Sequence, residues 1–227
     1  MASIAENIST VRDQIARATA SCGRPSGSVA LLTVTKTQAP EKLREAYAAG
    51  QREFGENYVQ EALEKILSLD LPDLIWHFIG PIQSNKTADI ATHFDWVHSV
   101  DRLKIANRLS SQRPLDCPPL NICVQVNLSQ EDSKSGVALE DTAALCELLA
   151  KLPRLRLRGL MAIPAPCAEH AQQRDVFRPL TRLFSELQGR FEHLDTLSIG
   201  MSADYEAAIE EGSTIVRVGS AIFGVRG

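Results

Sequence analysis

Lys36 is the residue of this chain whose type and place most clearly predict chemistry. It ends an apolar run over residues 29–36, and the chain turns away by Pro40. A lysine at the carboxyl end of a buried strand meets a ligand-binding face. Burial there would lower the pKa of its amine and leave a neutral nucleophile for an aldehyde. The competing interpretation is an ordinary lysine that points into water, as most lysines do.

Arg217 is a second residue in unusual surroundings for a charge. Within the apolar run 215–218, strand alternation puts Arg217 on the opposite face from Val216 and Val218. If the valines pack against helices, Arg217 points inward, where a guanidinium needs a carboxylate or a ligand atom as partner. A structural salt bridge and a ligand contact both satisfy that need. Facing a heterocyclic nitrogen, the permanent charge would keep that nitrogen unprotonated.

Small residues stand at the ends of the last two predicted strands. Ser202 precedes residues 203–206 in a pattern typical of a helix N-cap with acidic residues in the first turn. Gly219 and Ser220 lie in the last predicted strand. In eight-stranded α/β barrels, loops after strands seven and eight bind phosphate with exposed amides and a helix N-terminus. Each motif alone is typical of ordinary capping or a tight turn, but the two together favour a phosphate site.

These features match the parts of one cofactor. Pyridoxal 5'-phosphate (PLP) needs an amine for its aldehyde, amides for its phosphate and a group for its ring nitrogen. Lys36, the two small polar segments and Arg217 would supply those three groups. The residues therefore predict a PLP site.

The elements that must position these residues alternate along the chain. Apolar, β-rich segments predict strands at 29–36, 52–56, 75–80, 96–100, 121–128, 156–163, 196–201 and 215–223. Amphipathic segments predict helices at 41–49, 58–69, 83–93, 101–111, 139–152, 173–190 and 203–211. This alternation is typical of right-handed parallel βαβ units and fits an α/β fold of the (β/α)8 TIM barrel type. A doubly wound open sheet is the competing fold, weakened because no GxGxxG follows the first strand.

The two ends of the chain complete the fold prediction. Residues 4–20 predict an amphipathic helix, and the last strand, 215–223, leaves too few residues after it for an eighth helix. We therefore expect the N-terminal helix to cover that sector of the barrel. Because no linker, repeat or low-complexity stretch interrupts the chain, residues 1–227 are expected to form a single PLP-binding barrel domain.

Composition narrows the class of protein further. A net charge of -4 and a pI near 5.8 predict no binding to nucleic acid or to an anionic membrane. The apolar runs are shorter than the roughly 20 residues that cross a bilayer, and the start lacks the pattern of a secretion signal. The five cysteines and five histidines show no metal-ligand spacing. We expect reduced thiols, a cytoplasmic protein and no metal site.

Several ordered blocks of the sequence resemble one known family. The chain resembles the YggS/PROSC family of PLP-binding (pyridoxal phosphate homeostasis) proteins over nearly its whole length. The blocks that carry the resemblance are TVTKT (33–37), FGENYVQE (54–61), HFIGPIQSNK (77–86), SKSG (133–136), GLMAIP (159–164), LSIGMSADY (197–205) and RVGSAIFG (217–224).

The resemblance implies a barrel like the N-terminal domain of alanine racemase, a fold type III PLP protein, with an added N-terminal helix. It implies a PLP Schiff base on Lys36 and places Arg217 against the pyridine nitrogen. It also implies phosphate binding by Ser202, Gly219 and Ser220, and positions beside the cofactor for Asn57, His77, Met161 and Met201.

The function that the resemblance implies is PLP homeostasis: binding, buffering and delivery of PLP to apo-PLP enzymes, with effects on amino-acid and keto-acid balance. The family is generally regarded as lacking demonstrated enzymatic activity. Related racemases and decarboxylases carry a second, β-rich domain for which this chain has no room, and a guanidinium at the ring nitrogen weakens PLP as an electron sink. We expect a monomeric binding protein rather than an enzyme. The alternatives are a small racemase-like PLP enzyme and a regulatory protein whose PLP state a partner reads.

Lys134 is a candidate second amine. It lies in the polar segment 130–136, which follows the fifth predicted strand and contains no apolar residue to pin it to the core. We expect Lys134 to capture PLP released from Lys36 during exchange. A solvated loop lysine with no role is the competing interpretation.

Overall fold

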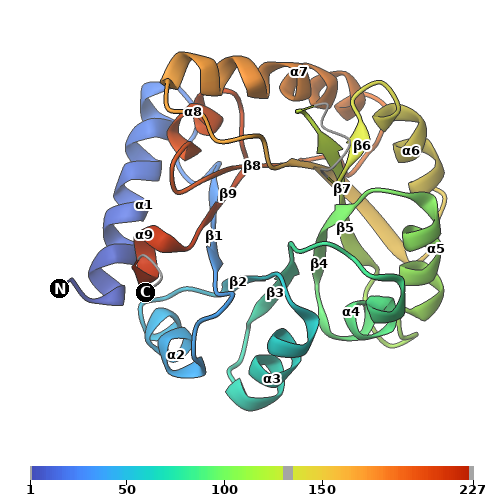
Figure 1. Ribbon diagram of the computed structural model, residues 1–227, viewed down its shortest axis with the longest axis horizontal. Helices are drawn as coiled ribbons and strands as arrows, with labels where there is room; N and C mark the ends of the chain where they lie inside the picture. The colour runs from blue at the N-terminus through green and yellow to red at the C-terminus, as the bar shows by residue number, and fades with distance from the viewer. Residues whose placement is uncertain (1, 130–134, 225–227) are drawn as a thin grey trace.

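The computed structural model describes residues 2–129 and 135–224, and its strands close into a barrel (Figure 1). Eight parallel strands follow one another around the ring, and the pairings β4–β5 and β9–β1 complete it. They are β1 (Ala30–Val34), β2 (Glu53–Glu56), β3 (Ile75–Phe78), β4 (Trp96–Val100), β5 (Leu120–Asn127), β7 (Leu155–Ala162), β8 (Thr196–Met201) and β9 (Ile215–Val218). The predicted TIM barrel is confirmed, and the doubly wound open sheet is excluded.

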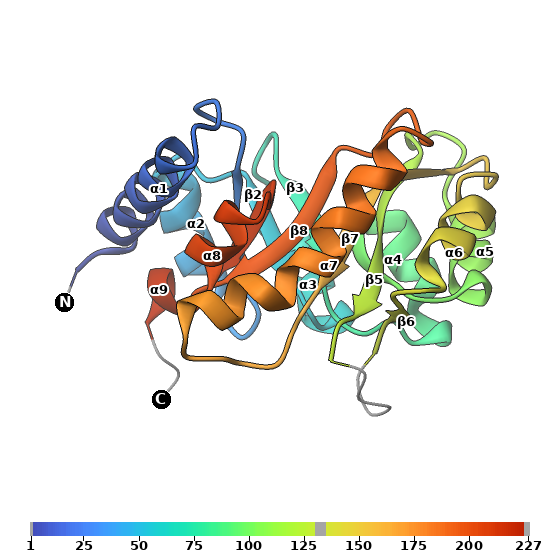
Figure 2. The same ribbon diagram turned by 90° about the horizontal axis from the view of Figure 1, so that it is seen from above.

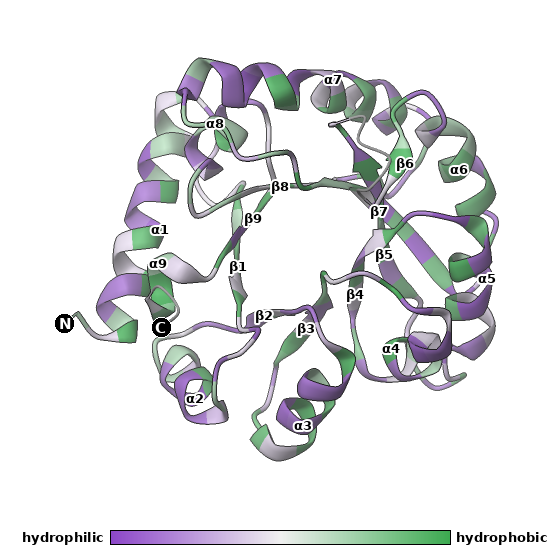
Figure 3. Ribbon diagram, viewed as in Figure 1, coloured by the Kyte–Doolittle hydropathy of each residue, from purple (hydrophilic) through white to green (hydrophobic). Residues whose placement is uncertain are grey.

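Helices surround the ring of strands (Figure 1), and in the view turned by 90° they lie on both sides of the strands (Figure 2). They are α1 (Ile4–Ser21), α2 (Pro40–Ala48), α3 (Val59–Leu69), α4 (Thr87–His93), α5 (Leu103–Gln112), α6 (Thr142–Leu149), α7 (His170–Gln188), α8 (Tyr205–Glu210) and α9 (Ser220–Phe223), with a 3-10 turn η1 (Ser84–Lys86). Figure 3 shows hydrophobic and hydrophilic bands alternating along the longer helices. Their apolar faces bury the outward faces of the strands, and this layer forms the main core.

The inside of the barrel holds a separate, smaller apolar cluster. Leu32, Ile79 and Ile215 form it, with Ala30 and Val34 packed against them. Because side chains alternate along a strand, the residues between these positions point to the helices. Buried polar side chains occupy other inward positions, among them His77, His98, Ser198 and Arg217.

The N-terminal helix covers the sector of the ring outside β1 and β9, as predicted. α1 contacts α2, α8 and α9 (Figure 1). It buries Ile8, Val11 and Ile15 on one face. Asn7 Nδ2 of the same helix donates a hydrogen bond to the carbonyl oxygen of Ile222 at 2.8 Å, which ties α1 to α9.

Some predicted boundaries were wrong. β1 ends at Val34, so Lys36 follows the strand rather than ending it. β9 ends at Val218, and Ser220–Phe223 form α9, so a short helix does follow the last barrel strand. A brief apolar run does not distinguish strand from helix by its periodicity, which is why the sequence misled here. A further two-residue strand, β6 (Val137–Ala138), pairs with β5 outside the ring and was not predicted.

The described residues offer no helix that could span a membrane, no three-ligand metal site and no disulfide. No helix among them is long and apolar enough to cross a membrane. Residues 2–129 and 135–224 contain no group of three or more His, Cys, Asp or Glu side chains placed to hold a metal ion. All five cysteines are free thiols.

Candidate functional site

A cavity of about 460 Å³ opens at the carboxyl ends of the barrel strands, where proteins of this architecture bind ligands. Of the predicted site residues, its lining contains Lys36, Asn57, Met201, Ser202, Arg217, Gly219 and Ser220. The lining is completed by Val34, Gln38, Ile79, Ile163, Ala203 and Gly224. Side chains from both ends of the sequence therefore meet in one cavity.

His77 and Met161 do not line this cavity. Both side chains are fully buried. Each comes two residues before a lining residue, Ile79 and Ile163 respectively, and so lies deeper in the barrel. His77 instead contacts another imidazole, with its Nδ1 2.9 Å from His98 Nε2. Contact of His77 and Met161 with the cofactor stays a prediction, without support from the cavity lining.

Lys36 lies half-buried at the cavity, on a turn of the chain just after β1. The Thr35 N–H donates to the carbonyl oxygen of Gly55 at 2.9 Å. Thr37 has a φ of 64°, a left-handed conformation that costs a β-branched residue about 1–3 kcal/mol. Its N–H donates to Glu61 Oε1 at 2.5 Å. These contacts hold the turn that carries Lys36 in one shape.

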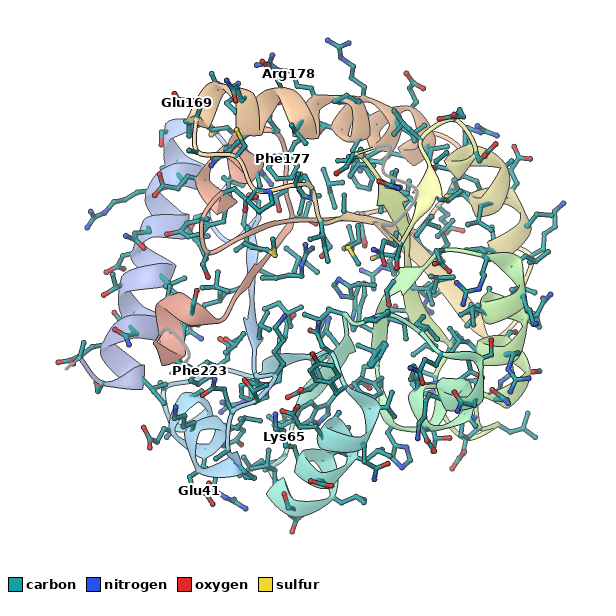
Figure 4. The ribbon with its side chains drawn as sticks, in the orientation of Figure 1. Glu41, Lys65, Glu169, Phe177, Arg178 and Phe223 are labelled. Carbon is teal, nitrogen blue, oxygen red and sulfur yellow. The ribbon has the colours of Figure 1, made fainter. Side chains whose placement is uncertain are left out.

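A second lysine, Lys65 of α3, is buried between that helix and the barrel (Figure 4). Its Nζ donates to the Thr35 carbonyl oxygen at 2.7 Å, to Glu56 Oε1 at 2.7 Å and to Glu61 Oε1 at 2.5 Å. Glu61 is also the acceptor for the Thr37 N–H. Lys65 therefore contacts the turn from both sides of the cavity lysine, directly at Thr35 and through Glu61 at Thr37.

Sequence reasoning missed Lys65, although its spacing carried a signal. Val59, Ala62, Lys65 and Leu69 recur along the buried face of α3. A lysine within an apolar stripe must find a buried partner, since an unpaired buried ammonium is very costly. The spacing predicts that such a partner exists, but the partners come from other elements of the fold as well as from α3.

Glu56 is the buried carboxylate that Lys65 neutralises. It is fully buried on β2, and its Oε1 also accepts the Thr35 hydroxyl at 2.6 Å. Its Oε2 has no hydrogen-bond partner among the residues that the structure describes. Burial raises the pKa of Glu56, and the charge and hydrogen bond of Lys65 oppose that rise. The ionised form of buried Glu56 is therefore stabilised by the charge of Lys65.

Arg217 points into the barrel, as strand alternation predicts, and is 3% exposed. Its Nη1 donates to the Ser198 carbonyl oxygen at 2.5 Å and to Ser198 Oγ at 2.8 Å, and its Nη2 donates to the Ala162 carbonyl oxygen at 2.9 Å. Within the described residues these neutral acceptors hold the guanidinium in place of the salt bridge considered above. Burial lowers the pKa of Arg217 to about 10, against the effect of the Asp204 charge, so it stays charged at neutral pH.

Ser202 lines the cavity but is not the N-cap of the following helix, as the sequence had suggested. Asp204 occupies that position before α8. The Met201 N–H donates to Asp204 Oδ1 at 2.6 Å, which folds the segment back on itself. Two potential capping residues stand close together in this sequence, and only the path of the backbone selects between them. Ser202 is thereby left at the cavity.

Gly219 and Ser220 lie on the same side of the cavity as the end of β9. Gly219 occupies the N-cap position of α9, and a Cβ there would come within 3.1 Å of the Val34 carbonyl oxygen. The close approach of two backbones explains why glycine suits this position. The first N–H groups of a helix have no acceptor within it. Those of Ile222 and Phe223 donate to the Gly219 carbonyl oxygen, so the N–H groups of Ser220 and Ala221 are the ones suited to bind an anion.

The lining fits PLP, the cofactor that the resemblance implies. The Lys36 amine suits an aldehyde, the Arg217 guanidinium suits an accepting ring nitrogen, and the hydroxyls of Ser202 and Ser220 suit a phosphate. Asn57 adds a buried Oδ1 that has no hydrogen-bond partner among the described residues. A buried acceptor of this kind calls for a donor, which a ligand can supply.

Lys134, the predicted second amine, lies outside the described residues, and its role stays a prediction. The described chain continues at Ser135, whose carbonyl oxygen accepts a hydrogen bond from Gln125 Nε2 at 3.1 Å. Gly136 follows with a φ of 126°, a conformation that favours glycine.

Comparison with known proteins places the chain among relatives of similar length. The family model of the alanine racemase N-terminal domain matches residues 2–227. The pyridoxal phosphate homeostasis protein of Pseudomonas aeruginosa is 60% identical over 227 residues, which cover 100% of this chain and 97% of that protein. The protein of the same name from Escherichia coli K12 is 53% identical over 229 residues, covering 100% and 98%. The structure of PipY from Synechococcus elongatus with PLP bound is 39% identical, with a TM-score of 0.86, and covers 97% of this chain and 100% of that one.

Replacing Lys65 with methionine should destabilise the protein by about 3–5 kcal/mol near neutral pH, because Glu56 then keeps a buried charge without a cation. The pKa of folded Glu56 is already raised, and loss of Lys65 raises it further. Between the unfolded and folded pKa values the folded state binds more protons, so the stability of the variant should fall as the pH rises through that window. Urea unfolding of parent and variant from mildly acidic to mildly alkaline pH measures the difference.

Two further variants check this assignment. Lys104→Met replaces an exposed lysine and should change stability by less than about 0.5 kcal/mol. Lys65→Met combined with Glu56→Gln removes both charges and should recover much of the loss. A Lys65→Met deficit that is independent of pH and is not reduced in the double variant contradicts a Glu56–Lys65 ion pair.

Proposed function

The chain belongs to the family of the pyridoxal phosphate homeostasis proteins, and on that premise we propose that it binds PLP in the cavity at the carboxyl ends of its strands. Residues 1–227 act as one binding domain, monomeric and cytoplasmic, that buffers PLP and delivers it to apo-PLP enzymes. The observation that carries this proposal is the meeting of Lys36, Arg217 and the Ser202 and Ser220 hydroxyls in a single cavity.

Each part of the cofactor meets a group suited to it in this proposal. The Lys36 amine holds the aldehyde carbon covalently. Ser202, Gly219 and Ser220 surround the phosphate with hydroxyls and helix amides. Arg217, charged at neutral pH, faces the ring nitrogen and keeps it unprotonated. PLP when bound supplies an electron-withdrawing ring, and an unprotonated ring nitrogen reduces that capacity.

The make-up of the cavity supports binding rather than turnover. A racemase needs acid–base groups on both faces of its substrate. Among the described lining residues the ionisable side chains are Lys36 and Arg217, and the rest are apolar, amide, hydroxyl or glycine. The names of the relatives from Pseudomonas aeruginosa and Escherichia coli, which refer to homeostasis and to no reaction, point the same way. Turnover of a panel of D- and L-amino acids by the PLP-loaded protein would contradict a non-catalytic role.

Lys36 is expected to be the covalent attachment point for PLP. The purified protein should be yellow, and borohydride reduction followed by peptide mapping should mark Lys36. Lys36→Ala should lose the long-wavelength absorption band, although PLP anchored by its phosphate can remain noncovalently. Lys104→Ala, a change at an exposed lysine on α5, should keep the band and the label. A label on any lysine other than 36 rejects the assignment.

Loss of a phosphate contact and loss of the ring contact should weaken PLP binding to different extents. Ser202→Ala should weaken PLP binding by about 1 kcal/mol, because backbone amides still hold the phosphate. Arg217→Glu should disturb affinity and the absorption spectrum more, because it reverses the charge beside the ring nitrogen. Since a buried carboxylate there endangers folding, Arg217→Met is measured alongside, with circular dichroism to verify the fold. Unchanged affinity and spectrum in all three variants would reject this geometry.

Delivery is tested by transfer to an apo-PLP enzyme. Lys134→Ala should leave the absorption spectrum of bound PLP intact but change the rate at which acceptor activity appears, because a second amine is removed from the exchange route. Lys151→Ala, at an exposed lysine after α6, is the matched control and should transfer at the parent rate. Identical kinetics in the parent and both variants would return Lys134 to the class of solvated loop lysines.

A further inference from the structure

A line of polar side chains crosses the barrel interior below the cavity. Arg217 Nη1 lies 2.8 Å from Ser198 Oγ, which lies 2.8 Å from His98 Nδ1. His98 Nε2 lies 2.9 Å from His77 Nδ1, and His77 Nε2 lies 3.4 Å from Glu53 Oε2. We name these five residues, which come from β9, β8, β4, β3 and β2, the interior chain.

The donors and acceptors along the interior chain indicate where its protons lie. Arg217 can only donate, so Ser198 Oγ accepts from it, and we assign the hydroxyl proton to the contact with His98 Nδ1. A neutral His98 then carries its proton on Nε2 and donates to His77 Nδ1. His77 in turn carries its proton on Nε2. This atom makes no hydrogen bond among the described residues, but it lies 3.4 Å from the Glu53 carboxylate, which attracts that N–H. The hydrogen bond from Arg217 and the nearby carboxylate of Glu53 therefore favour the same arrangement: two neutral imidazoles protonated at Nε2.

Burial and the neighbouring rings support this arrangement. His77, His98 and Ser198 are fully buried. Burial lowers the pKa of His98 well below its usual value, and the nearby His77 and Arg217 lower it further. Trp96 stacks on His77 with ring centroids 5.4 Å apart and planes at 9°, which limits rotation of that imidazole. The side chain of Glu53 is 31% exposed, so the line runs from the cavity toward a solvent-accessible carboxylate.

The interior chain acts on Arg217, a charged group that lines the cavity. A serine hydroxyl rotates freely unless something holds its proton. With that proton bonded to His98, Ser198 Oγ presents its lone pairs to Arg217. The two backbone carbonyl contacts of Arg217 are set by the strands, so Ser198 Oγ is the side-chain contact that orients the guanidinium.

We propose that Ser198, His98 and His77 are positioning residues that hold the Arg217 guanidinium toward the ring nitrogen of the cofactor. The part that concerns the cofactor rests on the proposed function. The proton arrangement does not, because it follows from the protein side chains alone.

The first experiment tests the proton arrangement without cofactor. Two-dimensional ¹⁵N–¹H correlation spectra of the imidazoles, recorded at neutral pH on protein freed of PLP, distinguish the two neutral tautomers and the imidazolium. His77 and His98, assigned with His77→Gln and His98→Gln variants, should both be neutral and protonated at Nε2. His170, with a half-exposed side chain, serves as the reference imidazole. Protonation of His98 at Nδ1 overturns the proposal.

The second experiment tests the action on Arg217 through bound PLP. Ser198→Ala should weaken PLP binding about 2- to 10-fold and shift its absorption maximum. Ser213→Ala is the matched control, because Ser213 is also fully buried and its hydroxyl bonds to backbone carbonyls, at 2.7 Å for Ile199, outside the interior chain. The control should lose thermal stability but keep the parent affinity and spectrum.

The outcomes separate this proposal from the function it rests on. If the Ser198→Ala spectrum and affinity match those of Ser213→Ala, the serine is merely structural and the positioning role is overturned. If the parent protein binds no PLP at all, the proposed function fails, and the role toward the ring nitrogen fails with it. The tautomer spectra then still decide whether the interior chain is ordered as described.

Discussion

The parallel pairing of β1 with β9 is the constraint on which the site depends. It sets Leu32 opposite Arg217 and Thr33 opposite Val218, so the first and last strands of the barrel end beside one another. Lys36 follows the one and Gly219 the other, and both reach the same cavity. In a closed ring no strand edge is left over, so the register of each pair is held by its neighbours on both sides. The separation of these groups is therefore a property of the whole ring.

Two buried cations, Lys65 and Arg217, lie close to this cavity and have different kinds of partner. Lys65 meets the carboxylate of Glu56 on an adjacent element, so its charge is neutralised inside the protein. Arg217 is held by carbonyl oxygens and a serine hydroxyl, which leave its net charge in place. The first arrangement stabilises the turn around Lys36, and the second keeps a positive charge at the floor of the cavity. The Arg217 charge can attract an anionic ligand, because no ion pair within the described residues neutralises it.

The barrel interior is divided into an apolar part and a polar part, which differ in their need for hydrogen-bond partners. Leu32, Ile79 and Ile215 fill one part and need no partner. The imidazoles and the serine beside them are buried polar groups that need hydrogen-bond partners. The line from Arg217 to His77 supplies them at Ser198 and His98, whereas His77 Nε2 has none among the described residues and lies 3.4 Å from Glu53. A network of this kind specifies one arrangement of side chains, whereas apolar packing alone tolerates several. A rigid floor suits the proposed role of holding PLP and releasing it unchanged.

The sequence by itself determined the features that local pattern controls. The alternation of strands and helices predicts the barrel, and the two-residue period of a strand predicts that Arg217 points inward. The apolar run before Pro40 places Lys36 just after the first strand, although it does not give the exact residue at which that strand ends. What only the tertiary structure decided involves partners brought together by closure. No local sequence pattern predicts that Ser198 and His98 form a line with Arg217. The strand of Ser198 lies next to the strand of Arg217, and the strand of His98 lies across the ring from it only because the barrel closes. Likewise Asp204 rather than Ser202 is the N-cap of α8, and residues 220–223 form a helix rather than continuing the strand. The local sequence is compatible with either structure in each case, and packing selects one of them.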